Sequence, residues 1–199
     1  TDANLSVSGA SGAGGAFIIG DAVTATWNNT AGGENNADIS SVAVDFSQFG
    51  GGSSVAATNS SGTWAATYNI TAGSIDATNL NITLIATDDA GNTTSRSDIS
   101  NNTLDNIAPT LTDTHISVGG ASGTGGVFIA GDTFTATWNN TASGDNNSDT
   151  ITGVTFDFST FGGSSNVSAV NSSGTWTAQY LLPTGSITTT NLNVSATAT

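Results

Sequence analysis

Two short acidic loops hold the residues of this chain that are best suited to chemistry. Residues Glu34–Asp38 read Glu-Asn-Asn-Ala-Asp, residues Asp145–Asp149 read Asp-Asn-Asn-Ser-Asp, and glycine directly precedes each loop. Carboxylate and amide oxygens are the ligands of a hard cation such as Ca²⁺, which takes about 6–8 of them. Turns prefer the same residue types, because Asn, Asp and Gly accept left-handed geometry and hydrogen-bond their own backbone. Each loop therefore predicts either a calcium site or an ordinary turn.

Other site chemistries have little support in the sequence. The chain has one histidine, one Lys or Arg in total and no cysteine, so the usual acid–base pairs, activated nucleophiles and transition-metal ligand sets are missing. His115 aligns with Asn4 in the repeat described below, and we expect it to be an exposed strand residue. We expect the protein not to be an enzyme.

The charge of the chain limits its partners. The formal net charge is −14, although only 8% of the residues are charged. Such a chain repels itself, and we expect it to bind neither nucleic acid nor an anionic membrane surface. No apolar run approaches the roughly 18 residues of a membrane helix, so membrane insertion is not expected. The sequence also has no initiator Met or signal segment, so we expect export, if it occurs, to be directed by other parts of the parent protein.

The chain contains nearly the same sequence pattern twice. The segment that ends at Trp27 returns with its end at Trp138, 138 − 27 = 111 positions later. Repetition at domain length predicts units of a tandem array. We expect one domain over residues 1–104, a linker over 105–111 and a second domain over 112–199. The second copy stops before the counterpart of the turn at 88–92, so it is expected to lack that turn and its last strand.

Period-2 alternation of apolar and polar residues dominates both copies and predicts strands. For the first copy, strands are expected near 5–7, 22–27, 42–46, 55–58, 64–70 and 80–87, with a last one within 94–104 and an extension near 17–19. Seven short strands separated by Gly, Asn and Ser clusters predict an all-β fold, an immunoglobulin-like antiparallel β-sandwich in each copy. Trp27 and Trp64 are in phase with the buried faces of their strands, so we expect them between the sheets.

This fold brings the acidic loops to the domain ends. In an immunoglobulin-like domain the loop after the second strand and the turn before the last strand meet where the chain enters. The hypothesised ligands of a first Ca²⁺ are therefore drawn from Glu34, Asp38, Asp88, Asp89 and Asn92. For an equivalent ion in the second domain they are Asp105, Asp145 and Asp149.

Three segments resemble the bacterial immunoglobulin-like repeats of giant surface adhesins, the extender regions of biofilm and RTX-type adhesins. They are Gly20–Trp27 with its repeat Gly131–Trp138, the turn Ala86–Thr93, and the linker Asp105–Thr110. The resemblance covers the whole chain. It implies a non-catalytic spacer outside a bacterial cell, with calcium at or near domain junctions and neighbouring repeats of the same polypeptide as partners.

Two other functions remain open from the sequence. Thr24 and Thr26, with Thr135 and Thr137 in the second copy, lie on outward strand faces and are consistent with binding a polysaccharide or a surface such as ice. The incomplete second copy is also consistent with a filament subunit that a neighbour completes with a strand.

Overall fold

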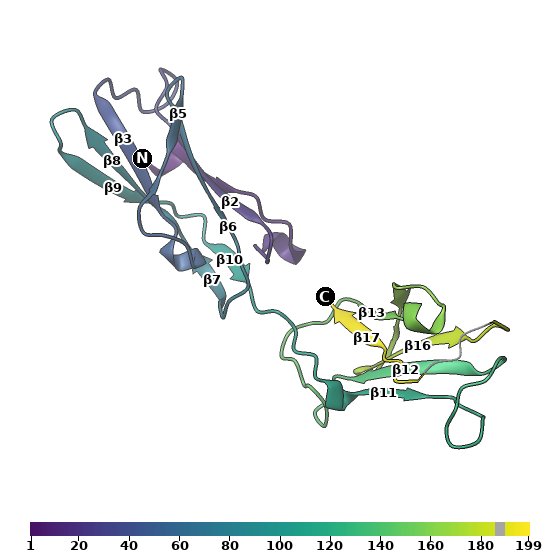
Figure 1. Cartoon of the computed structure of the whole chain (residues 1–199). Coiled ribbons are helices and arrows are strands. Elements are labelled where there is room, and N and C mark those ends of the chain that lie inside the picture. The colour runs from purple at the N-terminus through teal and green to yellow at the C-terminus, as the bar shows by residue number, and fades with distance from the viewer. Residues whose placement is uncertain (186–189) are drawn as a thin grey trace. The chain divides into compact units, whose positions relative to one another are not determined.

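The computed structural model describes residues 1–185 and 190–199. The chain divides into two compact units, unit 1 (Thr1–Ala108) and unit 2 (Pro109–Thr199), each built of β-strands (Figure 1). Within the described residues the helical segments are three-residue 3₁₀ turns, and none is long and apolar enough to cross a bilayer. The fold is all-β with antiparallel sheets, as the sequence predicts.

Unit 1 contains three antiparallel sheets. The first has the order β1-β2-β6-β5, formed by β1 (Leu5–Ser8), β2 (Ala22–Asn28), β6 (Thr63–Asn69) and β5 (Thr58–Ser60). The second has the order β4-β3-β8-β9, formed by β4 (Val55–Ala56), β3 (Ile39–Asp45), β8 (Thr83–Asp88) and β9 (Thr93–Ser97). A two-stranded sheet pairs β7 (Asp76–Leu80) with β10 (Asn102–Asp105). The 3₁₀ turns are Asp2–Asn4, Ala13–Gly15 and Ser47–Phe49.

The core of unit 1 lies between its two larger sheets. Buried residues alternate with partly exposed ones along β2, because successive side chains of a strand point to opposite faces. Trp27 and Trp64 are opposite each other in the β2–β6 register, and both are buried. They cluster with Val42 of β3 and Leu84 of β8, so the prediction that they lie between the sheets is confirmed.

The last two predicted strands of unit 1 are each divided in two, which the sequence analysis did not anticipate. Asn79, within β7, and Asn101, directly before β10, adopt positive φ values of 59° and 56°, which interrupt the extended geometry. The carboxylate of Asp98 is buried and accepts the Ile82 N–H at 2.7 Å, which replaces a strand-to-strand bond. As a result, β7 and β10 form a separate two-stranded sheet, while β8 and β9 belong to the four-stranded sheet.

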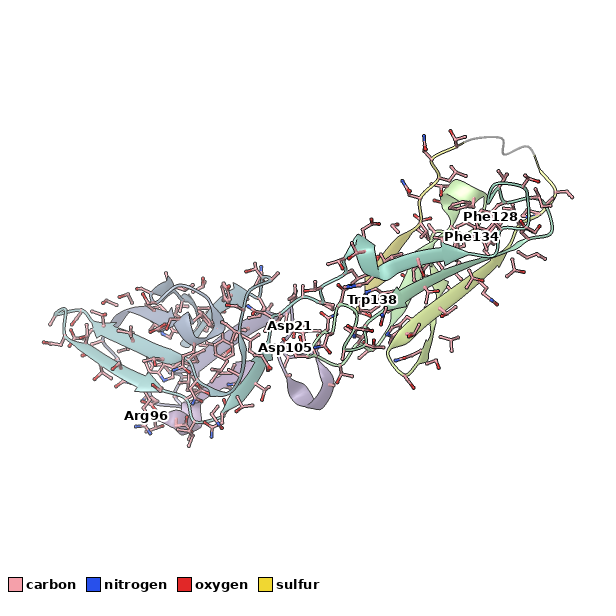
Figure 2. All side chains as sticks on the ribbon, turned by 90° about the horizontal axis from the view of Figure 1, so that it is seen from below. Asp21, Arg96, Asp105, Phe128, Phe134 and Trp138 are labelled. Carbon is pink, nitrogen blue, oxygen red and sulfur yellow. The ribbon has the colours of Figure 1, made fainter. Side chains whose placement is uncertain are left out.

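Unit 2 repeats the arrangement in two sheets. One has the order β11-β12-β16-β15, with β11 (Ile116–Gly119), β12 (Thr133–Asn139), β16 (Thr175–Leu181) and β15 (Val170–Ser172). The other has the order β14-β13-β17, with β14 (Val167–Ser168), β13 (Val154–Asp157) and β17 (Ser195–Ala198). The 3₁₀ turns are Asp113–His115 and Ser159–Phe161. Aromatic side chains fill the core, and Figure 2 shows Phe128 beside Phe134, with ring centroids 4.5 Å apart.

Candidate functional site

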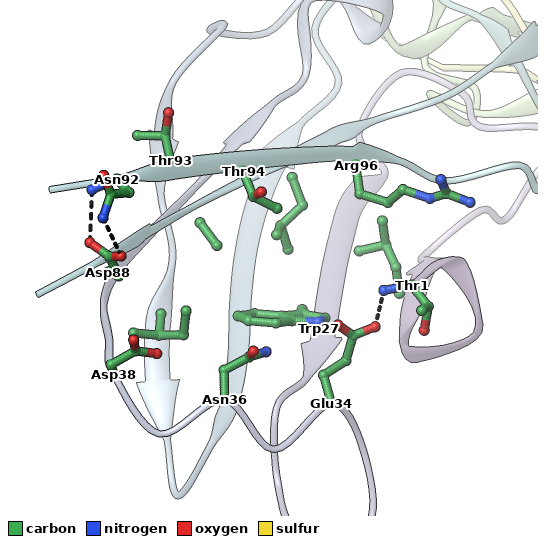
Figure 3. Close-up of a pocket in the computed structure, with 14 residues that line it drawn as sticks. Thr1, Trp27, Glu34, Asn36, Asp38, Asp88, Asn92, Thr93, Thr94 and Arg96 are labelled. Atoms are coloured by element: carbon green, nitrogen blue, oxygen red, sulfur yellow. Dashed lines mark hydrogen bonds and ion pairs between the residues drawn. The ribbon is translucent and has the colours of Figure 1, made fainter. Parts of the chain in front are cut away.

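The first acidic loop and the turn after β8 lie side by side at one end of unit 1. The Asp89 N–H donates to the Asp38 carbonyl oxygen at 2.9 Å. Next to this bond is an open cavity of about 330 Å³ (Figure 3). Among its lining residues are four of the five hypothesised ligands of the first ion, namely Glu34, Asp38, Asp88 and Asn92. Asp89 is not among the lining residues, and its backbone joins the two loops instead.

Two carboxylates of this cavity already have partners. Asp88 accepts the backbone N–H of Asn92 at 2.7 Å and its Nδ2 at 2.8 Å, and these bonds lower the pKa of Asp88 below its usual value. Glu34 pairs with the amino group of Thr1. Over residues 1–185 and 190–199, no three His, Cys, Asp or Glu side chains converge as a metal site. A Ca²⁺ bound here must therefore displace Asn92 from Asp88 or draw the loops closer, and calcium remains a prediction.

The remaining walls of the cavity combine apolar side chains with the one cationic side chain of the sequence. Figure 3 shows the Trp27 indole between the acidic loop and the residues of β9, with Arg96 across the cavity from Glu34. Leu5, Ile39, Leu84 and Ala86 supply further apolar lining. A cavity with apolar walls and a rim of carboxylates and amides suits an extended peptide as well as a cation.

In unit 2 the corresponding carboxylate, Asp145, is surrounded by donors. It accepts the Thr112 N–H at 2.9 Å, the Thr112 hydroxyl at 2.6 Å and the Trp138 Nε1–H at 2.6 Å. His115 Nδ1 lies 2.9 Å from the same carboxylate, whose side chain is 2% exposed. Burial raises the pKa of Asp145, but the hydrogen bonds from Thr112, Trp138 and His115 together outweigh burial and leave the pKa well below its usual value. A cation at Asp145 would have to compete with all of these donors.

His115 is not the exposed strand residue that the sequence analysis expects. It lies in the 3₁₀ turn Asp113–His115, and its side chain is 32% exposed and directed at Asp145. The misprediction arose because its counterpart Asn4 suggested a plain polar surface residue. Asn4 in fact makes the matching contact, with Nδ2 3.4 Å from Glu34.

Asn147 holds the linker against the second acidic loop. Its Oδ1 accepts the Thr110 N–H at 2.7 Å, and its Nδ2 donates to the Thr110 carbonyl at 2.9 Å. Asn140 orients it, because Asn140 Oδ1 accepts both the backbone N–H and the Nδ2 of Asn147 at 2.8 Å. Leu111, between the two bound residues Thr110 and Thr112, packs against the core of unit 2. We call Asp145 and Asn147 together the linker clamp.

A second amide anchors the chain where it leaves unit 1. Asn106 is 4% exposed; its Oδ1 accepts the Ile75 N–H at 2.8 Å, and its Nδ2 donates to the Thr71 carbonyl at 3.0 Å. The Asn106 backbone also bonds to Ile75 and Gly73, each at 2.8 Å. Only the three residues from 107 to 109 separate Asn106 from the clamped Thr110. The sequence pattern predicts the linker but neither of its anchors.

The last hypothesised ligands, Asp105 and Asp149, belong to different units. Asp105 ends β10 in unit 1, where its Oδ1 accepts the Ile107 N–H at 3.1 Å. Asp149 follows the clamp in the loop of unit 2. An ion shared by Asp105, Asp145 and Asp149 remains a prediction.

Asp21 and Asp132 have a local structural role directly before β2 and β12. Asp21 is buried and accepts hydrogen bonds from the Ser11 N–H, the Ser11 hydroxyl and the Ile18 N–H. Asp132 makes the same three bonds with the corresponding residues of unit 2. Each carboxylate thereby ties a glycine-rich loop to the start of a strand.

In both units, side-chain carboxylates and amides of these loops hold backbone groups, and in unit 2 they hold the linker. Comparisons with models of protein families, with curated proteins and with solved structures found no match to this chain.

Proposed function

We propose that this chain is a pair of non-catalytic spacer repeats from a large secreted bacterial adhesin, of the immunoglobulin-like extender type. The observation that carries the proposal is the pair of amide anchors around a three-residue linker. Asn106 fixes the chain at the exit of unit 1, and Asn147 fixes it again at Thr110. A spacer that transmits length or force needs short linkers that are anchored at both ends, whereas independently moving domains do not.

The strand orders support the immunoglobulin-like part of the proposal. In unit 1 the sheets β1-β2-β6-β5 and β4-β3-β8-β9 follow the A-B-E-D and C′-C-F-G orders of that fold. The strands of unit 2 from β11 to β17 follow one another along the chain in the same order as their counterparts in unit 1. Two units that share these strands and the framing contacts of the acidic loop are what a tandem array requires.

Calcium is the proposed stiffening ion, and unit 1 offers the better place for it. Glu34, Asp38 and Asp88 line one cavity, while Asp145 in unit 2 is engaged by protein donors. Neutralising three carboxylates would relieve repulsion in a chain with a net charge of −14. The proposed ion therefore adds to the stability of unit 1 more than to that of unit 2.

Backbone relaxation of the linker tests the spacer role. In ¹⁵N NMR, the amides of Ile107 and Ala108 are expected to have order parameters near 0.85, like those of the strands. Values below about 0.6 would show a flexible tether and would contradict a stiff spacer. The same measurement with Gly replacing Ile107, Ala108 and Pro109 gives the reference for a flexible junction.

Binding to a flat surface has weaker support. Thr24 and Thr67 place their Oγ1 atoms 3.2 Å apart across β2 and β6. In unit 2 the counterpart of Thr67 is Gln179, so the array of threonines is not repeated. A regular ligand such as ice or a polysaccharide lattice requires that regularity, and we therefore retain the spacer function.

A further inference from the structure

We infer that the cavity of unit 1 is a docking site for an extended, uncharged linker segment of the type found at residues 107–111, carried by another copy of this repeat. The inference depends on the comparison of the two units and not on the spacer role. A docked segment would engage Glu34 as Thr112 engages Asp145, so the segment and a calcium ion at Glu34 are alternative occupants of the cavity.

The two acidic loops present the same polar frame. Glu34 corresponds to Asp145 and Asn36 to Asn147, each pair 111 positions apart (145 − 34 and 147 − 36). The Thr1 nitrogen bonds to Glu34 as the Thr112 nitrogen bonds to Asp145. Asn29 holds Asn36 as Asn140 holds Asn147, with the Oδ1 of Asn29 accepting the backbone N–H at 2.7 Å and Nδ2 at 3.1 Å. The loop of unit 1 is therefore already shaped as a linker clamp.

Asn36 lies where the recognition of a peptide backbone is expected. In unit 2, Asn147 bonds to both the N–H and the carbonyl of Thr110. In unit 1, Asn36 lines the cavity beside Trp27 (Figure 3). A side-chain amide that offers one acceptor and one donor pairs with an extended backbone of any sequence.

The apolar walls of the cavity correspond to part of the core against which Leu111 packs in unit 2. Leu111 packs against the core cluster of unit 2; Trp138 belongs to that cluster, and Ile116, Ile151 and Ala198 also pack against it. The counterparts of these four residues in unit 1 are Leu5, Trp27, Ile39 and Ala86, and all four line the cavity. The cavity therefore presents apolar side chains that correspond to part of the cluster against which Leu111 packs in unit 2.

The chemistry of the linker also fits the charge of the site. Residues 107–111 read Ile-Ala-Pro-Thr-Leu and contain no ionisable side chain. The cavity carries Glu34, Asp38 and Asp88, so an acidic segment would be repelled while a neutral one is not. Pro109 keeps the segment extended before it binds, which lowers the entropy lost on docking.

The test adds the segment where it can reach the cavity. Ile-Ala-Pro-Thr-Leu is fused directly before Thr1 of the full chain, which gives it a high effective concentration at the site. We expect amide hydrogen exchange in β2 of unit 1 to slow by about ten-fold and the Trp27 indole NMR signal to shift. The reference is the same chain with Gly-Ser-Gly-Ser-Gly in that position, which changes the amino terminus in the same way.

Two variants make the result decisive. Replacing the leucine of the added segment by Gly leaves both units intact and should abolish the protection, while Asn147→Ala should leave the protection of unit 1 unchanged. Equal exchange with the two extensions, or protection that survives the leucine replacement, would overturn the inference.

Discussion

The entry ends of the two units carry the same loop in two different environments. In unit 2 the loop binds the linker through Asp145 and Asn147, and Trp138 beneath it is completely buried. In unit 1 the loop borders an open cavity, and Trp27 is 5% exposed. The comparison shows that the acidic loop of unit 2 holds linker backbone, whereas the loop of unit 1 leaves its cavity open. Their resemblance to cation-binding loops follows from the same residue types, because donors on a peptide and a cation both require oxygen acceptors.

Removing the carboxylate of the acidic loop is expected to give the largest difference in stability loss between the two units. Asp145→Ala leaves the Thr112 N–H, the Trp138 Nε1–H and His115 without their acceptor, so unit 2 should lose about 3 kcal/mol of unfolding free energy. Glu34→Ala removes a pair with the exposed amino group of Thr1 and should cost unit 1 less than about 1 kcal/mol. Hydrogen exchange resolved by unit in the full chain measures both. Equal losses in the two units would contradict the assigned role of Asp145.

Calcium is expected to affect the stability of unit 1 more than that of unit 2, the opposite of the carboxylate substitutions. With free Ca²⁺ at a hundred-fold excess over its Kd, unit 1 should gain about 2.7 kcal/mol, and unit 2 should gain little. Thermal unfolding in calcium, in EGTA and in EGTA with excess magnesium measures the gain, and Asp38→Asn should abolish it. A gain confined to unit 2, or none at all, would exclude the cavity as the calcium site.

The two loop asparagines form a matched pair of substitutions. Asn147→Ala and Asn36→Ala each remove an Nδ2 bond to the neighbouring Asn140 or Asn29, but only Asn147→Ala also frees Thr110. Two hydrogen bonds at about 1 kcal/mol each predict that Asn147→Ala costs about 2 kcal/mol more. Denaturant unfolding followed by exchange in each unit checks this difference. Indistinguishable costs would mean that the Thr110 contacts add no stability.

The smallest expected difference in stability between the two units is the one produced by acid. The pKa of Asp145 is lower in the folded chain than its unfolded value of 3.8, so its contribution is complete above that pH and is lost as pH falls below it. At pH 3 the loss in unit 2 should reach about 1 kcal/mol from this group alone. Asp145→Asn should remove this part of the pH dependence, as measured by unfolding between pH 6 and pH 3. An unchanged profile would show that Asp145 titrates alike in the folded and unfolded chain.

The sequence was informative where a local pattern determines the structure. Alternation identified the strands around Trp27 and Trp64 because a half-buried strand must present one apolar face. It missed the breaks near Ile82 and Asn101 because they depend on the buried Asp98, whose partner is 16 residues away in the chain.

The candidate site was predictable to a similar extent. The pattern placed Glu34, Asp38, Asp88 and Asn92 at one cavity, because loops at one end of a sandwich must converge. It did not predict that Asn147 and Asn106 bind backbone. An asparagine in a loop has many possible partners, and its choice is set by a linker whose path is fixed only in the folded unit.

The most direct test of a fixed junction is the distance distribution between the two units. The chain has no cysteine, so Ser60→Cys and Ser172→Cys, at exposed positions on β5 and β15, give two unique sites for spin labels. Electron–electron double resonance should give one narrow distribution in the parent chain and a clearly broader one when Asn147→Ala is added. A parent distribution as broad as that of a chain with Gly-Gly-Gly at residues 107–109 would contradict the spacer proposal.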